Sequence, residues 1–249
     1  AQMRNLQNIL DCPILDRTTL ILEIFASRAR TREAKLQVES ARLQYVLPSL
    51  TGMHKALSRQ GGGSGVANKG AGEKKLELDR RRIEKRISEL RKELDRIAKE
   101  RETQRQKRQG SGVPRVALVG YTNAGKSTLL NTLTNAGVLE EDQLFATLDP
   151  TTRVLELENH QNLMLTDTVG FIRKLPHHLI EAFKSTLEEA RYCDIVLNVV
   201  DCSDPQMDMH MHVVKETLRE LGITDKTVVT VFNKTDKLEE SGLPIPRDF

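Results

Sequence analysis

Hydrophobic positions in the first part of the chain follow a helical spacing. Between residues 31 and 108, leucine and isoleucine recur at steps of three, four and seven, which is the seam of helices that pair side by side. In the second helical segment these positions are Leu76, Ile83, Ile87, Leu90, Leu94 and Ile97. The glycine-rich stretch Ser58–Gly72 separates the two segments and predicts a loop. The pattern therefore predicts an antiparallel helical hairpin with this loop at its tip.

Local signals predict where the helices begin and end. Asp16 is placed as an N-cap before an apolar helix over Thr19–Ala29. Pro48 is expected to end or kink the first hairpin helix, because proline lacks an N–H group and its ring collides with the preceding turn. The second hairpin helix resumes at Glu73, and residues 110–114 are interpreted as a linker.

Beyond this linker, short apolar runs alternate with segments of helical spacing. We predict strands at Val116–Val119, Arg153–Glu158, Asn162–Thr166, Ile195–Asp201 and Thr227–Phe232. Helices are predicted at Lys126–Leu133, His178–Arg191 and Met207–Leu221. Strands that alternate with helices form a mostly parallel sheet with helices on both faces. We therefore predict an α/β domain over residues 111–249, preceded by a partial N-terminal domain with the helical hairpin over residues 1–110.

The net charge of the whole chain, +3, conceals a large difference in charge between these two regions. Residues 1–110 hold 25 Lys and Arg against 14 Asp and Glu, a balance of +11, while residues 111–249 have a balance of −8. A basic region joined to an acidic one suggests that the first contacts a polyanion. No apolar run approaches the ~20 residues of a membrane span, and the three cysteines form no disulfide framework. We expect a cytoplasmic protein without a membrane partner.

A phosphate-binding motif stands directly after the first strand. Residues 120–127 read G-x-x-x-x-G-K-S, whose backbone N–H groups and following helix form an anion site. Lys126 is predicted to reach the β- and γ-phosphates, and the Ser127 hydroxyl is predicted to ligate Mg²⁺. The predicted nucleotide-binding residues of this loop are Gly120, Tyr121, Thr122, Asn123, Ala124, Gly125, Lys126 and Ser127.

A second motif follows the third strand. Its predicted nucleotide-binding residues are Asp167, Thr168, Val169 and Gly170. We expect Asp167 to hold Mg²⁺ through a water and the Gly170 N–H group to contact the γ-phosphate. Phe171 comes next, where many related enzymes have a glutamine that orients the attacking water, and a phenyl ring cannot do that.

A third motif ends the fifth strand and predicts which base is bound. It consists of Asn233, Lys234, Thr235 and Asp236. An Asp carboxylate at this place accepts two hydrogen bonds from the N1–H and N2–H₂ groups of guanine, and adenine offers no such pair. The pattern predicts GTP rather than ATP as the nucleotide.

The segment 145–153 lies between the phosphate-binding loop and the second strand. This is where a GTP-binding domain is expected to have its first switch, the segment that responds to the γ-phosphate. Its predicted nucleotide-binding residues are Phe145, Ala146, Thr147, Leu148 and Asp149. One threonine of this segment is expected to complete the Mg²⁺ shell when a γ-phosphate is present. Spacing does not choose among Thr147, Thr151 and Thr152.

Histidine and cysteine give weaker signals. His177 with His178, and His210 with His212, have spacings seen in metal sites, but no further cluster supports them. We interpret these histidines as surface residues. The three cysteines, Cys12, Cys193 and Cys202, are interpreted as small buried apolar residues.

Taken together, the four motifs resemble the HflX family of translational GTPases. Four N-terminal segments carry the same resemblance: Leu15–Thr18, Ser27–Glu39, Leu57–Gly63 and Gly70–Glu73. The resemblance implies that Thr147 is the switch I ligand of Mg²⁺. It also implies binding to the large ribosomal subunit and, in bacterial members, splitting of ribosomes stalled by stress such as heat. The loop sequence Asn123–Ser127 also resembles the loops of potassium-stimulated GTPases, which implies that Asn123 is a ligand of K⁺.

The charge pattern agrees with a ribosomal partner. Small residues at the hairpin tip allow close approach to rRNA, and basic side chains there would neutralise phosphates. The predicted RNA contacts are Lys55, Arg59, Lys69, Lys74 and Lys75. We expect a monomer in which the acidic α/β domain binds GTP or GDP. The bound nucleotide is expected to control when the protein associates with the ribosome and when it is released. Family members extend further at both ends, so we interpret the chain as a fragment.

Slow GTP hydrolysis is the predicted reaction, with Lys126 absorbing charge and Asn123 holding the cation. Two other classes stay open. One is a GTP-dependent regulatory switch whose helical arm binds a protein, which the salt dependence of binding would distinguish from an RNA contact. The other is a P-loop ATPase acting on DNA, against which Asp236 argues.

Overall fold

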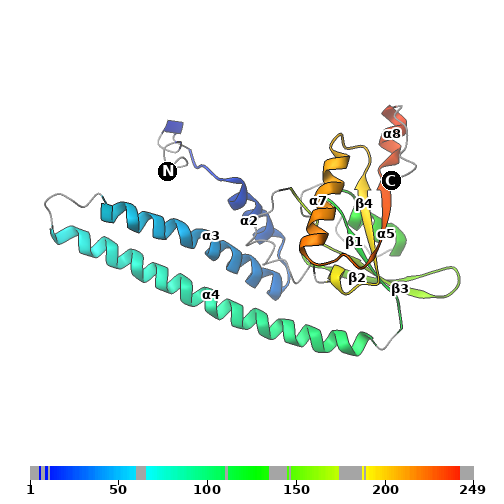
Figure 1. Cartoon of the computed structure of the whole chain (residues 1–249), viewed down its shortest axis with the longest axis horizontal. Coiled ribbons are helices and arrows are strands. Elements are labelled where there is room, and N and C mark those ends of the chain that lie inside the picture. Colours follow the sequence, from blue (N-terminus) through cyan, green and yellow to red (C-terminus); the bar gives the residue numbers. More distant parts are fainter. Residues whose placement is uncertain are drawn as a thin grey trace. The chain divides into compact units, whose positions relative to one another are not determined.

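A computed structural model describes residues 6, 9–10, 12–59, 66–109, 112–134, 145, 147–173, 187 and 189–241. At 51–59, 66–74, 104–109 and 239–241 it describes the backbone alone. The chain divides into two compact units, shown in Figure 1. The helical unit comprises residues 1–27 and 31–104, and the α/β unit comprises residues 28–30 and 105–249. None of the described helices has an apolar stretch long enough to cross a membrane.

The helical unit contains an antiparallel pair of long helices, as the seam predicted. Helix α2 covers Arg17–Arg28, α3 covers Arg32–Arg59 and α4 covers Val66–Gln109. Cross-links show the direction of pairing: Arg86 donates two hydrogen bonds to Glu39 at 2.7 and 3.0 Å, and Arg101 pairs with Glu33 at 3.0 Å. Since low numbers in α3 meet high numbers in α4, the two helices run in opposite directions (Figure 1).

Burial along the pair follows the predicted seam. Ile87 and Leu90 of α4 are buried, as are Ala34, Val38 and Ala41 of α3. At the start of α2, Asp16 accepts a hydrogen bond from the Thr19 N–H group at 2.7 Å, which is the predicted N-cap.

The predicted loop at 58–72 and the predicted start of the second helix at Glu73 were wrong, and Pro48 does not end the first helix. Helix α3 passes through Pro48 and ends at Arg59, and α4 begins at Val66, so much of the predicted 58–72 loop is helical; residues 60–65 lie outside the described part. One proline removes a single backbone hydrogen bond, and each glycine costs about 1 kcal/mol in a helix. Extension of an existing helix is cooperative, so a long paired helix absorbs these costs.

The α/β unit is built on a five-stranded sheet in the order β2-β3-β1-β4-β5. The strands are β1 (Arg115–Val119), β2 (Thr151–Glu156), β3 (Asn162–Asp167), β4 (Ile195–Asp201) and β5 (Thr227–Asn233). Strand β1 pairs in parallel with β3 and β4, β4 pairs in parallel with β5, and β2 pairs antiparallel with β3. The mostly parallel sheet of the prediction is confirmed.

Helices lie on both faces of this sheet. Helix α5 covers Lys126–Thr134, α7 covers Met207–Glu220 and α8 covers Thr235–Ser241. Leu130 of α5 packs with Leu118, Leu165 and Val199 in a buried cluster, while α7 lies on the other side of β1 and β4 (Figure 1). Of the predicted helix 178–191, the structure describes only residues 187 and 189–191, which are helical. This arrangement brings the carboxyl ends of β1, β3, β4 and β5 to one edge, where the motifs lie.

Candidate functional site

The loop between β1 and α5 requires glycine at its first position. Gly120 has a φ of +151°, and a Cβ atom there would lie 2.3 Å from the backbone oxygen of Val199. Because α5 begins at Lys126, the loop leads directly into the amino end of a helix. Backbone N–H groups at such an end attract anions, so this local fold is suited to holding a phosphate.

Lys126 is the buried cation of this loop. Its Nζ atom donates to the backbone oxygens of Tyr121 at 3.0 Å and Gly120 at 3.4 Å. Burial lowers the pKa of Lys126 to about 8, although the charge of Asp167 acts in the opposite direction. A phosphate would supply the negative charge that this buried ammonium group lacks.

Three oxygen-bearing side chains meet beside the loop. The Ser127 hydroxyl lies 2.7 Å from the Thr147 hydroxyl, and both donate to Asp167 Oδ2, at 2.6 and 2.8 Å. Asp167 is completely buried, and its Oδ1 atom has no hydrogen-bond partner among the described residues. Carboxylate and hydroxyl oxygens are the donors that Mg²⁺ prefers, so this cluster fits that ion.

The other candidate threonines occupy strand positions. Thr151 begins β2, and the Thr152 hydroxyl lies 2.9 Å from that of Thr166 across the β2–β3 ladder. Among the three threonines that spacing left open, Thr147 is the one whose hydroxyl contacts Ser127 and Asp167.

The segment that begins with the Asp167–Gly170 motif, which we call the second switch, is joined to the phosphate loop by its backbone. Phe171 donates its N–H group to the Gly120 oxygen at 3.0 Å, and its own oxygen accepts from the Thr122 N–H group at 2.8 Å. Gly170 lies so close to the loop that a Cβ atom would be 2.6 Å from Thr122 Cα and 3.1 Å from Lys126 Nζ. The Gly170 backbone is therefore held close to both the phosphate loop and the Lys126 ammonium group.

The third motif is fastened to the phosphate loop. Asn233 donates to the Ala124 oxygen at 2.9 Å, and Lys234 Nζ donates to the Asn123 oxygen at 2.9 Å. Lys234 also pairs with Asp201 at 2.8 Å, and this contact, together with hydrogen bonds from Ser203, outweighs burial and keeps the pKa of Asp201 low. Such cross-links fix the distance between the phosphate site and the start of α8.

Asp236, the predicted base-reading residue, lies in the first turn of α8 and is exposed. Cys202, which sequence reasoning left as a buried apolar residue, is buried and supports this segment: its N–H and thiol both contact the Asn233 oxygen, at 3.1 and 2.9 Å. Cys193 is also buried, whereas Cys12 is exposed, so the prediction for Cys12 was wrong.

Several predicted nucleotide-binding residues place their side chains in the core instead. Phe145, Leu148 and Val169 are buried, and the Thr168 hydroxyl donates to the Leu118 oxygen at 2.6 Å inside the unit. Their contribution to the site is to hold the backbone of the switches in place. Ala146 lies outside the described residues.

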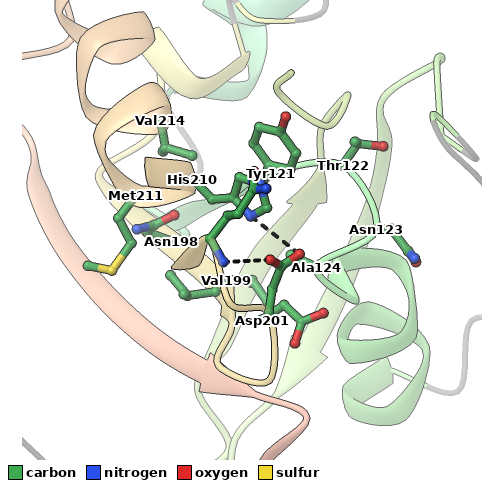
Figure 2. A pocket seen from close by; sticks show the side chains of 13 residues that line it. Tyr121, Thr122, Asn123, Ala124, Asn198, Val199, Asp201, His210, Met211 and Val214 are labelled. Atoms are coloured by element: carbon green, nitrogen blue, oxygen red, sulfur yellow. Dashed lines mark hydrogen bonds and ion pairs between the residues drawn. The ribbon is translucent and has the colours of Figure 1, made fainter. Parts of the chain in front are cut away.

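Tyr121 places its ring against helix α7. The ring stacks on His210 of α7 with centroids 3.7 Å apart and an interplanar angle of 13° (Figure 2). Its hydroxyl also accepts a hydrogen bond from the Arg173 N–H group at 3.2 Å. With 14% of its side chain exposed, His210 is not the surface residue that we predicted, whereas His212 is exposed. Single-sequence spacing carries no signal for this contact, because it joins two elements far apart in the chain.

Of the predicted RNA contacts, only Lys75 has a described side chain, and it is exposed on α4. Lys69 and Lys74 lie in α4, and Lys55 and Arg59 lie in α3, with side chains outside the described part.

Family profiles match three consecutive parts of the chain. Residues 1–26 match a GTP-binding GTPase N-terminal region, residues 28–108 match a GTP-binding GTPase middle region, and residues 115–234 match a 50S ribosome-binding GTPase. These matches follow the order of the helical and α/β regions along the sequence.

Individual relatives agree with the profiles. A protein named GTPase HflX from Lacrimispora saccharolytica is 65% identical over 236 residues, covering 95% of this chain and 55% of that protein. GTPase HflX of Escherichia coli is 47% identical over 248 residues, covering 100% and 58%. A GTP-binding protein of Sulfolobus solfataricus, solved in complex with GDP, has a TM-score of 0.53 at 32% identity, covering 90% and 57%. The chain thus spans a little more than half the length of the relatives that it matches.

Proposed function

Because this chain belongs to the HflX family, we propose that it binds GTP with the loop 120–127 and hydrolyses it to GDP and phosphate. The observation that carries the proposal is the convergence of the buried Lys126 with the oxygen cluster of Ser127, Thr147 and Asp167. These four side chains come from three separate segments, and each is of the type that a bound nucleoside triphosphate requires.

Phosphate binding is the first task of the site. The N–H groups of the loop and of the first turn of α5 would donate to the β-phosphate, and Lys126 would exchange its carbonyl contacts for phosphate oxygens. Mg²⁺, held by Ser127, Thr147 and Asp167, would supply positive charge to the β- and γ-phosphate oxygens. The Gly170 N–H group would then orient the γ-phosphate from the side of the second switch.

Backbone groups near Phe171, rather than its side chain, would have to position the attacking water. Phe171 is buried, with 2% of its surface exposed, and its main chain is tied to Gly120 and Thr122. It offers no polar side-chain atom to a water. The rate therefore depends on backbone groups and on added positive charge near the γ-phosphate, which explains why we propose slow intrinsic hydrolysis.

A cation held by Asn123 is the proposed source of extra positive charge. We expect GTP hydrolysis to be roughly tenfold faster in potassium than in sodium buffer, since ~1.4 kcal/mol of added transition-state stabilisation has that effect. Asn123→Ala should hydrolyse at the sodium rate in both buffers, as measured by phosphate release. Equal rates of the unaltered protein in the two buffers would remove the potassium proposal without affecting GTP binding.

Gly170→Ala tests the close approach of the second switch. The new Cβ atom would collide with the Thr122 backbone at 2.6 Å, so the switch must move by several tenths of an ångström. We expect kcat to fall about 10²-fold, because a displacement near the reacting phosphate disrupts alignment. Gly222→Ala is the matched control: nothing lies within 4 Å of its Cβ position, so only stability should fall, by about 1 kcal/mol for a φ of +70°. Unchanged kcat in Gly170→Ala would contradict the placement of the γ-phosphate.

We further propose that the partner is the large ribosomal subunit in the cytoplasm, and that the basic helical hairpin contacts its rRNA to split or rescue ribosomes stalled by stress. The +11 balance of residues 1–110 and the match to a 50S ribosome-binding GTPase support this partner. GTP would favour the ribosome-bound shape by ordering the switches, and hydrolysis would release it.

Sedimentation of the protein with large subunits tests this proposal. We expect co-sedimentation with a non-hydrolysable GTP analogue, less with GDP, and a steep loss as salt is added, because phosphate contacts release counterions. Substituting Lys69, Lys74 and Lys75 by Glu should weaken association at least about tenfold, whereas Lys215→Glu on α7 should not. Binding that is insensitive to salt would favour the alternative, a switch whose helical arm docks on a protein.

A further inference from the structure

Behind the phosphate loop lies a cavity that the proposed reaction does not use. It has a volume of about 330 Å³ and is bounded by the loop, the end of β4 and α7 (Figure 2). The lining residues that matter here are Tyr121, Asn198, Asp201, Asp204, His210 and Met211. Lys126, Ser127 and Asp167 are not among the described residues that line it. The cavity therefore borders the phosphate loop through Tyr121–Ala124 but does not include Lys126, Ser127 or Asp167.

Asn198 is an unusual residue for its place in the sheet. Its neighbours in β4, Leu197 and Val199, face the apolar cluster under α5, so strand alternation turns Asn198 to the α7 face, where it lines the cavity. Asn198 is 6% exposed, and its Oδ1 atom has no hydrogen-bond partner among the described residues. Leaving such an acceptor unpaired costs about 1–3 kcal/mol. A ligand that donates a hydrogen bond would recover this cost.

The charged groups around the cavity are acidic. No Lys or Arg occurs among its described lining residues. The Asp201 carboxylate is paired with Lys234, whereas Asp204 accepts from the Gln206 N–H group at 2.8 Å and lies 3.7 Å from His210. The cavity therefore offers hydrogen-bond acceptors and negative charge. Such a lining disfavours binding of an anion and favours binding of a cation that carries several hydrogen-bond donors.

A flat wall adds a shape requirement. The stacked rings of Tyr121 and His210 line the cavity (Figure 2). Asp204 lies 3.7 Å from His210. Aromatic faces attract cations, and a planar cation gains more from stacking than a tetrahedral one.

We propose that this cavity binds a guanidinium group. A guanidinium is planar, permanently charged and carries five N–H donors in a fork, so it offers donors both to Asn198 Oδ1 and to the Asp204 carboxylate, which line the cavity, and a flat face to the ring wall. The compact ammonium of lysine cannot stack in this way. The cavity has room for a whole arginine side chain, and Thr122 and Asn123 of the phosphate loop also line it, so the bound group would lie against the back of the nucleotide site.

Nuclear magnetic resonance titration of the whole chain, loaded with GDP, tests the proposal. The probes are methylguanidinium, for a small-molecule source, and the blocked peptide Gly-Arg-Gly, for a protein source, with Gly-Lys-Gly as the control. We expect saturable shifts of the Tyr121, Asn198 and His210 amide signals with both guanidinium probes, and about tenfold weaker binding of the lysine peptide. Tighter binding of the arginine peptide than of methylguanidinium would indicate a protein source, and the reverse a small molecule.

Asn198→Leu removes the acceptor at nearly constant volume and should abolish the saturable shifts while GDP binding persists. Asn162→Leu, at the exposed start of β3, is the matched control and should bind the probes normally. If Asn198→Leu does not fold, Asp204→Asn, compared with the exposed Asp225→Asn, should weaken guanidinium binding about tenfold or more. Absence of saturable shifts at the cavity, equal binding of the lysine peptide, or unchanged binding by both cavity variants would overturn the proposal.

Discussion

Lys126→Met is expected to lower the affinity for GTP by roughly 10²- to 10⁴-fold while making the nucleotide-free protein more stable. The loss of affinity follows from removing two charge-assisted hydrogen bonds to phosphate oxygens, each of which contributes about 1.5–3 kcal/mol. The gain in stability follows from removing a buried charge, whose pKa burial has lowered from 10.5 to about 8. Function and stability thus make opposite demands on this residue.

The size of the stability effect depends on pH. Below pH 8 both the native and the unfolded chain hold the Lys126 proton, so the cost of burying the charge, about 3 kcal/mol, is fully present. Between pH 8 and 10.5 the unfolded chain keeps this proton while the native chain releases it, so native stability rises with pH. Loss of the hydrogen bonds to the Gly120 and Tyr121 oxygens offsets part of the gain in the variant. We expect a net gain of about 1–2 kcal/mol at neutral pH that shrinks as pH rises.

Urea unfolding at pH values on either side of 8, with GTP affinity measured by fluorescence titration, checks both parts. Lys215→Met is the matched control, because Lys215 is exposed on α7 and should change neither quantity. A nucleotide-free variant that is less stable than the unaltered protein at neutral pH would show that the Lys126 charge is not costly in the folded state. Unchanged GTP affinity would remove Lys126 from the phosphate site.

Local motifs were predictable because a few consecutive residues determine them. Gly120 is required by a φ of +151° and by the approach of Val199, and helix α5 starts at the predicted Lys126. The strands were placed to within two residues for the same reason, since each is a short run rich in apolar residues within the local sequence. Elements of this kind depend little on what the rest of the chain does.

Helix ends in the hairpin were not predictable from residue preferences alone. Pro48 and the glycines of the predicted loop lower the helical preference of their own positions. These preferences do not include the stabilisation that the partner helix provides. Buried Leu90 and Ile87 of α4 pack in a seam that continues along the pair, and this tertiary stabilisation favours longer helices. The preference of single residues is a weak guide where such pairing exists.

Contacts between distant segments explain what remained open in the site. The choice of Thr147 over Thr152 depends on the antiparallel register of β2 with β3, in which Thr152 faces Thr166. The stacking of Tyr121 on His210 depends on how α7 lies over β4. Neither contact can be detected in the residue spacing of a single sequence. The sequence therefore indicated which residue types form the site, but not which distant residues they contact.

Asp236→Asn is expected to replace the preference for guanine by a preference for xanthine. The Asp236 carboxylate lies at the start of α8, which Asn233 and Lys234 fasten to the phosphate loop, so its distance from the bound phosphates is fixed. A carboxylate accepts from both N1–H and N2–H₂ of guanine, whereas an amide must present one donor to that pair. Xanthine has an oxygen in place of the 2-amino group, and the Asn amide would complement it with one donor and one acceptor.

We expect GDP affinity to fall roughly 10²-fold and the affinity for the xanthine nucleotide to rise by a similar factor, since a buried polar mismatch in a base site discriminates strongly. Competition of each nucleotide against a fluorescent GDP analogue measures the ratio. Asp208→Asn, in the exposed first turn of α7, is the matched control and should keep the guanine preference. If Asp236→Asn retained GDP and still rejected the xanthine nucleotide, base selection would have to come from another part of the protein, and the hydrogen bonds assigned to Asp236 would be wrong.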